Sequence, residues 1–260
     1  MGTDSPLRTE IRGRTLVVTI DRPDRRNAVD GPTGAALHQT FLDFDADDAA
    51  DVAVLTGAAG TFCAGADLKA VSEGTGNRVE TDITKPSPLG CTRLLLSKPV
   101  IAAVEGHAVA GGLELALWCD LRVAATDAVF GVYCRRWGVP LVDGGTVRLP
   151  RLIGQSRALD LILTGRGVSG DEALAFGLAN RLCEPGQALA TALELAEALG
   201  AFPQLCLRAD RLSSYEQWGM PLTDALANEI RHGMGPIRAG ETLEGARRFA
   251  GGAGRHGEAV

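Results

Sequence analysis

Two short turns rich in small residues are the segments of this sequence best suited to chemistry. Residues 61–68 (TFCAGADL) and 109–115 (VAGGLEL) each follow a strand-like segment and lead into a helix-like one. Small side chains let a ligand approach the backbone, and the start of a helix offers unpaired N–H groups with partial positive charge. Two such turns facing each other would hold one carbonyl oxygen between two donors and stabilise it as an oxyanion.

Either turn alone has a simpler interpretation. A Gly-Gly pair between a strand and a helix is more often a packing device than a ligand site. Neither segment has the GxGxxG or GxxxxGK[ST] spacing that cradles phosphates, so the pattern does not favour a nucleotide site.

Glu114 is the acidic residue best placed to act beside these turns. It lies three residues after Gly111, about one helical turn, so its carboxylate can reach the same point in space. The flanking residues are apolar, and burying an unpaired carboxylate is costly. Glu114 is therefore either a proton-transfer group or half of a buried ion pair with Arg135 or Arg136.

Composition limits the classes of partner. The chain has 260 residues and a net charge of −6, and no basic stripe favours nucleic acid. The six cysteines are scattered without zinc-ligand spacing, so we expect no metal. No apolar run is long enough for a membrane span, and residues 1–14 lack the apolar stretch of a signal peptide. We therefore expect a single-domain cytoplasmic protein with reduced thiols.

The order of the expected elements indicates an α/β fold. Strand-like segments at residues 15–20, 51–56, 100–104 and 121–125 alternate with helical patterns at residues 32–45, 67–72 and 111–118. Residues 72–87 are almost free of apolar side chains and are expected to form a loop. The last third predicts helices at residues 187–199, 204–212, 221–231 and 240–249.

Several longer segments resemble one family in the right order along the chain. They are FCAGADLK (62–69), KPVIAAVEGHAVAGGLELALWCDLRVAA (98–125), LPRLIG (149–154) and TGRGVSGDEALAFGLANRL (164–182), with RPDRRNA (22–28) and GARRFAGGAGR (245–255) near the ends. Together they resemble the enoyl-CoA hydratase/isomerase, or crotonase, family. The resemblance implies a spiral of ββα units, with an acyl-CoA-binding core at residues 1–195. Residues 196–260 would form a helical trimerisation region of the same structural unit.

The resemblance also implies a site. The N–H groups of Ala66 and Gly111 would form the oxyanion hole, and coenzyme A would lie across residues 22–28 and 64–68. The substrate-binding set is then Arg22, Asn27, Ala28, Ala64, Gly65, Ala66, Asp67, Leu68, Gly111, Gly112 and Cys134. No separate cofactor is implied, because coenzyme A is part of the acyl-CoA thioester substrate. The expected assembly is a homotrimer or a dimer of trimers, without nucleic acid or membrane.

Cys134 marks a departure from the family pattern. Hydratases of this family typically use two glutamates; the first corresponds to Glu114, and the second lies in a pattern like FGQPE. Here that segment reads FGVYC, which puts Cys134 at the second position. A thiol of reference pKa about 8.5 is mostly protonated at neutral pH and replaces a carboxylate poorly. Cys134 is thus a packing residue or, without an obvious histidine partner, a nucleophile.

Asp143, before Gly144-Gly145-Thr146, is a candidate replacement for the missing carboxylate. A carboxylate at a comparable place serves as an acid/base group in the dienoyl-CoA isomerase branch, as the resemblance implies. The alternative is that Asp143 caps the next helix, a common role for aspartate before such a run.

Three functions follow. The leading expectation is an enoyl-CoA hydratase-like lyase in which Glu114 orients and deprotonates water. The second is a double-bond isomerase in which Glu114 and Asp143 move one proton between them without water. The third, from another class, is a catalytically weak acyl-CoA-binding protein.

Overall fold

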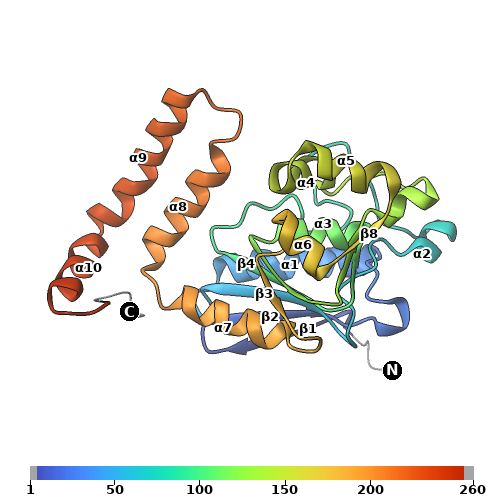
Figure 1. Ribbon diagram of the computed structural model, residues 1–260, viewed down its shortest axis with the longest axis horizontal. Helices are drawn as coiled ribbons and strands as arrows, with labels where there is room; N and C mark the ends of the chain where they lie inside the picture. Colours follow the sequence, from blue (N-terminus) through green and yellow to red (C-terminus); the bar gives the residue numbers. More distant parts are fainter. Residues whose placement is uncertain (1–4, 255–260) are drawn as a thin grey trace.

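A six-stranded sheet forms the centre of the computed structural model, which describes residues 5–254 (Figure 1). Its strands, in spatial order, are β1 (Leu7–Arg12), β2 (Thr15–Ile20), β3 (Val52–Gly57), β4 (Val100–Val104), β6 (Leu121–Ala125) and β9 (Arg181–Cys183). Only the β1–β2 pair is antiparallel, and the other neighbours are parallel. The α/β class and the four strands predicted from β-branched segments are confirmed.

A smaller second sheet contains the strand that leads into the small-residue turn at residues 109–115. It contains β5 (His107–Val109), β7 (Val129–Gly131) and β8 (Gly167–Ser169). Strand β5 leads directly into α3 (Gly111–Trp118), and an isolated bridge joins Ala108 to Cys63 of the other turn. This bridge brings the two turns together although they are far apart in sequence.

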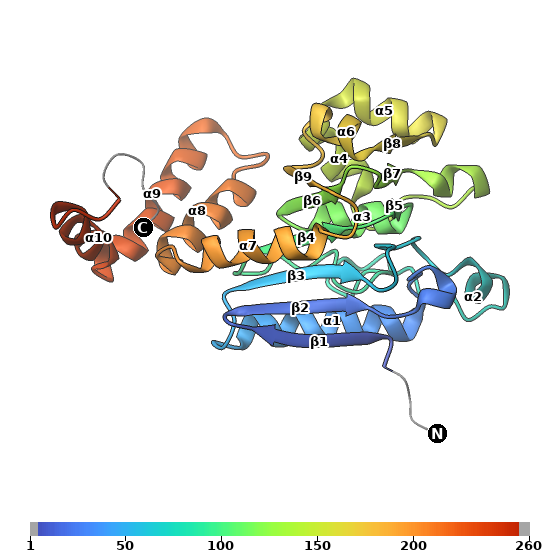
Figure 2. The same cartoon turned by 60° about the horizontal axis from the view of Figure 1, so that its bottom comes forward.

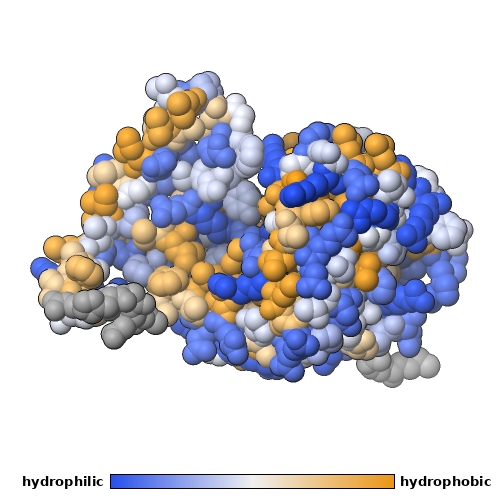
Figure 3. Space-filling model, viewed as in Figure 1, coloured by the Kyte–Doolittle hydropathy of each residue, from blue (hydrophilic) through white to orange (hydrophobic). Residues whose placement is uncertain are grey.

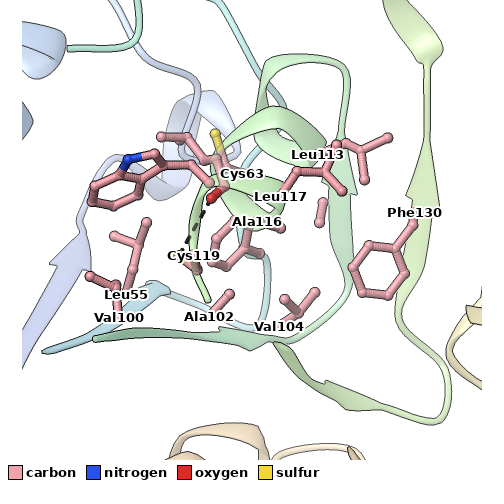
Figure 4. Packing of buried hydrophobic residues seen from close by; sticks show 14 of the residues in the cluster. Leu55, Cys63, Val100, Ala102, Val104, Leu113, Ala116, Leu117, Cys119 and Phe130 are labelled. Atoms are coloured by element: carbon pink, nitrogen blue, oxygen red, sulfur yellow. Dashed lines mark hydrogen bonds between the residues drawn. The ribbon is translucent and has the colours of Figure 1, made fainter. Parts of the chain in front are cut away.

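Both faces of the large sheet are covered at its central strands β3, β4 and β6, which explains why these strands are almost continuously buried. Helices α1 (Gly31–Ala46) and α3 share one core cluster with the upper face, where Phe41 and Trp118 meet edge to face with ring centroids 4.7 Å apart. Figure 4 shows Leu55 and Ala102 of the sheet below Ala116 and Leu117 of α3. Helix α7 (Ala188–Gly200) covers the opposite face.

The remaining core elements are short helices, of which α4 packs against α3. They are η1 (Pro23–Arg25), α2 (Leu68–Ser72), η2 (Tyr133–Trp137), α4 (Gly145–Ile153), α5 (Gln155–Thr164) and α6 (Gly170–Phe176). Residues 73–99 contain no helix or strand, in agreement with the predicted loop at residues 72–87. The guanidinium of Arg93 orders this loop by donating to the carbonyls of Glu80, Asp82 and Lys85.

Three C-terminal helices stand beside the core as an arm (Figures 1 and 2). They are α8 (Gln204–Glu216), α9 (Leu222–Arg238) and α10 (Glu241–Ala250). All three were expected, but α9 continues past the predicted end at residue 231. Polar contacts join α8 to the core: Arg211 and Tyr215 both bond Asp120, at 2.7 and 2.8 Å. The predicted division after residue 195 falls inside α7 and stays a prediction.

Two further properties of the described residues bear on function. None of their helices is both long and apolar enough to cross a membrane. Within the same residues, no group of three or more His, Cys, Asp and Glu side chains is arranged to hold a metal ion.

Candidate active site

The two small-residue turns lie against each other. The N–H of Cys63 donates to the carbonyl of His107 at 2.9 Å, and the N–H of Val109 donates to the carbonyl of Cys63 at 3.1 Å. A Cβ on Gly112 would lie only 2.0 Å from the Cys63 carbonyl oxygen, so glycine is required there for this contact. The two turns therefore face each other, which is the arrangement that the oxyanion-hole hypothesis requires.

Two backbone donors at this contact are unused. Among residues 5–254, the N–H groups of Ala66 and Gly111 have no hydrogen-bond acceptor, whereas the next N–H along, that of Asp67, bonds the carbonyl of Val29. Gly65 is the link between them: a Cβ on it would lie 2.7 Å from the nitrogen of Gly111. One carbonyl oxygen can thus be offered both donors, the arrangement that stabilises an oxyanion.

Ala110, which precedes the donor N–H of Gly111, has a strained backbone conformation. Its φ of 54° and ψ of −124° are unusual for a residue with a side chain. Such conformations cost roughly 1–3 kcal/mol and persist only where the surroundings enforce them. Here the N–H of Ala110 is held by the carbonyl of Gly131 at 2.8 Å, and α3 begins immediately afterwards. The strain sets the direction in which α3 presents its first N–H groups.

Glu114 lies one turn into α3 and is only 3 % exposed. Its Oε1 accepts hydrogen bonds from the N–H groups of Asp143 and Gly145, at 2.9 and 2.8 Å. Burial raises the pKa of Glu114 to about 7, and the nearby Asp143 carboxylate adds to this, while the two N–H donors oppose it. A carboxyl group with a pKa near neutrality is suited to both accepting and returning a proton.

The alternative role for Glu114, an ion pair with a neighbouring arginine, is wrong. Arg135 donates to the carbonyl of Ile162 and Arg136 to that of Gly165, at 3.1 Å each. Both side chains lie on the exposed side of η2, and Arg136 stacks on the Tyr133 ring. Backbone N–H groups, not a cation, satisfy the buried carboxylate.

Asp143 is 5 % exposed and lies on the same loop that binds Glu114. Its Oδ1 accepts from the N–H of Leu89 at 3.0 Å and from the hydroxyl of Thr92 at 2.7 Å. The interpretation of Asp143 as a helix cap is wrong, because α4 is preceded by Gly144 and no side chain caps it. Burial raises the pKa of Asp143, against the effect of the Thr92 and Leu89 donors.

Cys134 is buried at 6 % exposure in η2. Burial raises the pKa of its thiol, and the charge of the nearby Glu114 raises it further. The thiol is therefore protonated at neutral pH, which favours packing over the nucleophile alternative.

Comparison with known proteins agrees with this geometry. The model of the enoyl-CoA hydratase/isomerase family matches residues 10–251. The chain belongs to the enoyl-CoA hydratase/isomerase family. It is 38 % identical to enoyl-CoA hydratase EchA19 of Mycobacterium tuberculosis over 248 residues, which are 93 % of this chain and 92 % of that protein. It is also 35 % identical to carnitinyl-CoA dehydratase of Salmonella arizonae, covering 94 % and 95 % of the two chains.

A solved structure shares the crotonase fold. The crystal structure of enoyl-CoA hydratase EchA1 from Mycobacterium marinum matches with a TM-score of 0.89 and 40 % identity, over 95 % of this chain and 96 % of that one. The predicted family and fold are confirmed, and the chain is an enoyl-CoA hydratase-like, acyl-CoA-processing enzyme of the lyase type.

Three polar residues of the segments predicted to bind coenzyme A, Arg22, Asn27 and Asp67, have structural roles in this hydratase-like enzyme. The buried amide of Asn27 donates to the carbonyls of Ala58 and Thr61, at 2.9 and 2.6 Å, and its oxygen accepts from the N–H of Arg22. Arg22 bonds the Asp67 carboxylate at 3.2 Å, and the other oxygen of that carboxylate caps α2. These contacts fix the turn that carries Ala66.

The other predicted substrate-binding residues differ in how exposed they are. Ala28 and Gly112 are buried, Ala64 and Ala66 are half-buried, and Leu68 is exposed. A surface pocket beside this segment is lined by residues 5, 7, 8 and 21–25, including three arginines, Arg8, Arg22 and Arg25.

Leu89, Thr92 and Arg148 were not singled out by sequence reasoning, although they hold the loop that binds Glu114. Leu89 and Thr92 lie beyond a stretch read only as loop, and their contact with Asp143 spans more than fifty residues of sequence. Arg148 directly precedes the LPRLIG motif (149–154), and this position beside a family motif is the only feature of the sequence that indicates its importance.

Proposed function

We propose that this protein catalyses the syn addition of water to a 2-enoyl-CoA, or the reverse dehydration. The observation that carries the proposal is Glu114: a buried carboxyl group with a pKa of about 7, one helical turn from the unused N–H of Gly111. The relatives named as a hydratase and a dehydratase support this direction of chemistry.

The proposed mechanism uses the two turns and one carboxylate. The thioester carbonyl accepts from the N–H groups of Ala66 and Gly111, which stabilise the negative charge that develops on its oxygen. Oε1 of Glu114 stays on the loop N–H groups, and its other oxygen takes a proton from water as the water oxygen bonds to C3. The enolate then receives that proton at C2, which returns Glu114 to its ionised form.

Coenzyme A is proposed to lie across residues 22–28 and 64–68. In the pocket beside these residues, Arg8 pairs with Asp21, and Arg22 pairs with Asp30 and Asp67. Arg25 is therefore the proposed contact for an anionic phosphate, since a guanidinium group can bind two phosphate oxygens. No further cofactor enters the proposed reaction.

A panel of 2-enoyl-CoA thioesters, analysed by mass spectrometry, tests the function. Gain of one water, giving the 3-hydroxyacyl-CoA, supports a hydratase. A product of unchanged mass with a shifted double bond supports an isomerase. Binding of every thioester without turnover would leave only the weak acyl-CoA-binding alternative.

A second candidate, double-bond isomerisation, is supported by Asp143. This carboxyl group is buried near Glu114, and burial raises its pKa from the ordinary value of an aspartate. One carboxyl group would remove a proton from the acyl chain while the other returns one elsewhere.

Asp143→Asn tests this second role with little change in shape. The Asn oxygen can accept from Leu89 and Thr92 as the carboxylate does, so we expect a melting temperature close to that of the wild type. Turnover should fall at least about tenfold, because an amide cannot move a proton. Full activity on both a hydration and an isomerisation substrate would exclude Asp143 from the chemistry.

Cys134→Glu tests the departure from the two-glutamate pattern. A second carboxylate beside Glu114 would share the water, and we expect faster hydration of crotonyl-CoA by roughly tenfold or more. Steady-state rates of both proteins, compared with Cys134→Ser as a control of similar size, decide the point. An unchanged rate would show that the missing glutamate has no consequence here.

We further propose a cytoplasmic homotrimer, or a dimer of trimers. Helix α9 of the arm exposes the large apolar side chains of Leu222, Leu226, Ile230 and Ile237. Orange patches lie over this helix in Figure 3. Exposed apolar patches of this kind often mark subunit interfaces. Light scattering should give a mass three or six times the 27.1 kDa of the chain, and a monomer would contradict the proposal. All six cysteines are unpaired, which suits a reducing compartment.

A further inference from the structure

Arg148 lies in the first turn of α4, behind the loop that binds Glu114. Its guanidinium donates to the carbonyl of Asp143 at 3.0 Å and to the carbonyl of Thr92 at 2.6 Å. No carboxylate forms an ion pair with it among residues 5–254. This half-buried guanidinium therefore uses its hydrogen bonds to join two segments, the loop before α4 and the loop that contains Thr92.

These bonds close a ring around Asp143. Arg148 holds the Asp143 carbonyl, and the Thr92 hydroxyl holds the Asp143 carboxylate at 2.7 Å. The N–H of the same Asp143 is one of the two donors to Glu114. Fixing Asp143 at its carbonyl and its side chain thus fixes the direction in which its N–H points.

Gly144 makes this ring possible. Its φ of 98° lies in the region that favours glycine, and a Cβ there would come 2.1 Å from a terminal nitrogen of Arg148. The chain therefore bends back so that the guanidinium covers the turn between Asp143 and Gly145. Both N–H donors to Glu114 flank this covered residue.

We propose that Arg148 is a positioning residue for Glu114: it holds the turn whose N–H groups bind the Glu114 carboxylate and places a positive charge behind it. The inference deepens the proposed function, on which it rests, because Glu114 is the proton-transfer group of that function.

The charges around Glu114 define the expected effect. Asp143, on the loop before α4, raises the pKa of Glu114, and Arg148 lowers it. Cys134 of η2 faces Glu114 as a neutral thiol. Without this positive charge, only the two backbone N–H donors oppose the effects of burial and Asp143, so the pKa of Glu114 should rise.

Two substitutions separate charge from geometry. Arg148→Met removes both, whereas Arg148→Lys keeps the charge but cannot bridge two carbonyl groups with a planar fork. We expect both variants to lower the plateau turnover of the hydration by roughly tenfold or more, because the carboxylate is displaced. Only Arg148→Met should move the apparent pKa of the pH–rate profile upward, by roughly half a unit or more.

Arg122→Met is the matched control. Arg122 is a buried arginine that is also held by carbonyl groups, at 2.5 Å from that of Leu178 and 2.9 Å from that of Cys119, at the far end of α3 from Glu114. We expect this control to lose stability but to keep the wild-type plateau and apparent pKa. Arg148 variants that behave like the control, with lower melting temperatures alone, would overturn the inference.

A measurement that does not depend on catalysis separates the proposed hydratase function from the proposed role of Arg148. The melting temperature is measured against pH for Glu114→Gln alone, for Arg148→Met alone and for both together. The loss of stability caused by ionisation of Glu114 starts near the unfolded pKa in every variant, but it should continue to a higher pH when Arg148 is Met, because the folded pKa is raised. An unchanged pH dependence would overturn the inference. If the wild type forms no hydroxyacyl-CoA, the proposed function fails, while this measurement still decides the role of Arg148.

Discussion

Glu114→Gln is expected to lower turnover at least about a hundredfold while leaving affinity for a CoA thioester within several-fold of the wild type. The Gln oxygen can accept the same two bonds, from the N–H groups of Asp143 and Gly145, so the pocket keeps its shape. Only the ability to move a proton is lost. Single-turnover rates give the chemical step, and calorimetric titration with a non-reactive acyl-CoA gives the affinity.

The pH dependence of the free energy of unfolding gives an independent test of the pKa of Glu114 in the same variant. The pKa of Glu114 is about 7 in the fold against 4.5 for the free side chain. Because the folded pKa is the higher one, ionisation opposes folding: stability falls as pH rises from about 4.5 to 7 and then levels off. Glu114→Gln should thus be more stable than the wild type at pH 8, by on the order of 3 kcal/mol at most. The two proteins should converge near pH 4.

Two outcomes would contradict this role of Glu114. Wild-type turnover by Glu114→Gln would make the residue structural. If the stabilities of the wild type and Glu114→Gln depended on pH in the same way from pH 4 to 8, the pKa of Glu114 would be the same in the folded and unfolded states. The general acid/base with a pKa near 7 would then have to be another residue.

Local patterns predicted four of the six strands of the large sheet and none of the small sheet, whose strands are only three residues long. The β-branched run at residues 100–104 became β4, and the apolar spacing at residues 187–199 became α7, because strand and helix periods differ in the sequence itself. Helix α9 was predicted too short, since it continues through Gly235 and Pro236, residues that local reasoning treats as breakers.

The site was predictable where it depends on residues in one motif. Glu114 and Gly111 are three positions apart, so helical geometry alone relates them. The partner of Glu114 was not predictable, because a buried carboxylate suggests a cation, and here two backbone N–H groups of a distant loop satisfy it. Because every residue except proline has a backbone N–H, the residue types do not indicate which of these groups will bind a carboxylate.

Gly65→Ala is expected to reduce turnover at least about a hundredfold by separating the two oxyanion donors. The new Cβ would lie 2.7 Å from the Gly111 nitrogen and 3.0 Å from the Cβ of Ala110, closer than non-bonded atoms come. The turns must move apart, and one oxygen can then no longer reach both N–H groups. Loss of a single oxyanion donor typically costs 10²- to 10³-fold in kcat, roughly 2.7–4 kcal/mol of barrier.

The strain of this substitution needs a separate control, since Gly65 has a φ of 94° and any side chain there destabilises the fold. Gly60→Ala supplies it: Gly60 has a φ of 69°, and a Cβ would meet no atom within 4 Å. Placing alanine in such a backbone costs about 1–2 kcal/mol. Both variants should therefore lose melting temperature, but only Gly65→Ala should lose turnover per folded molecule. Equal turnover in the two variants would mean that the contact between Gly65 and Gly111 does not form the oxyanion site, and that the thioester carbonyl is bound elsewhere.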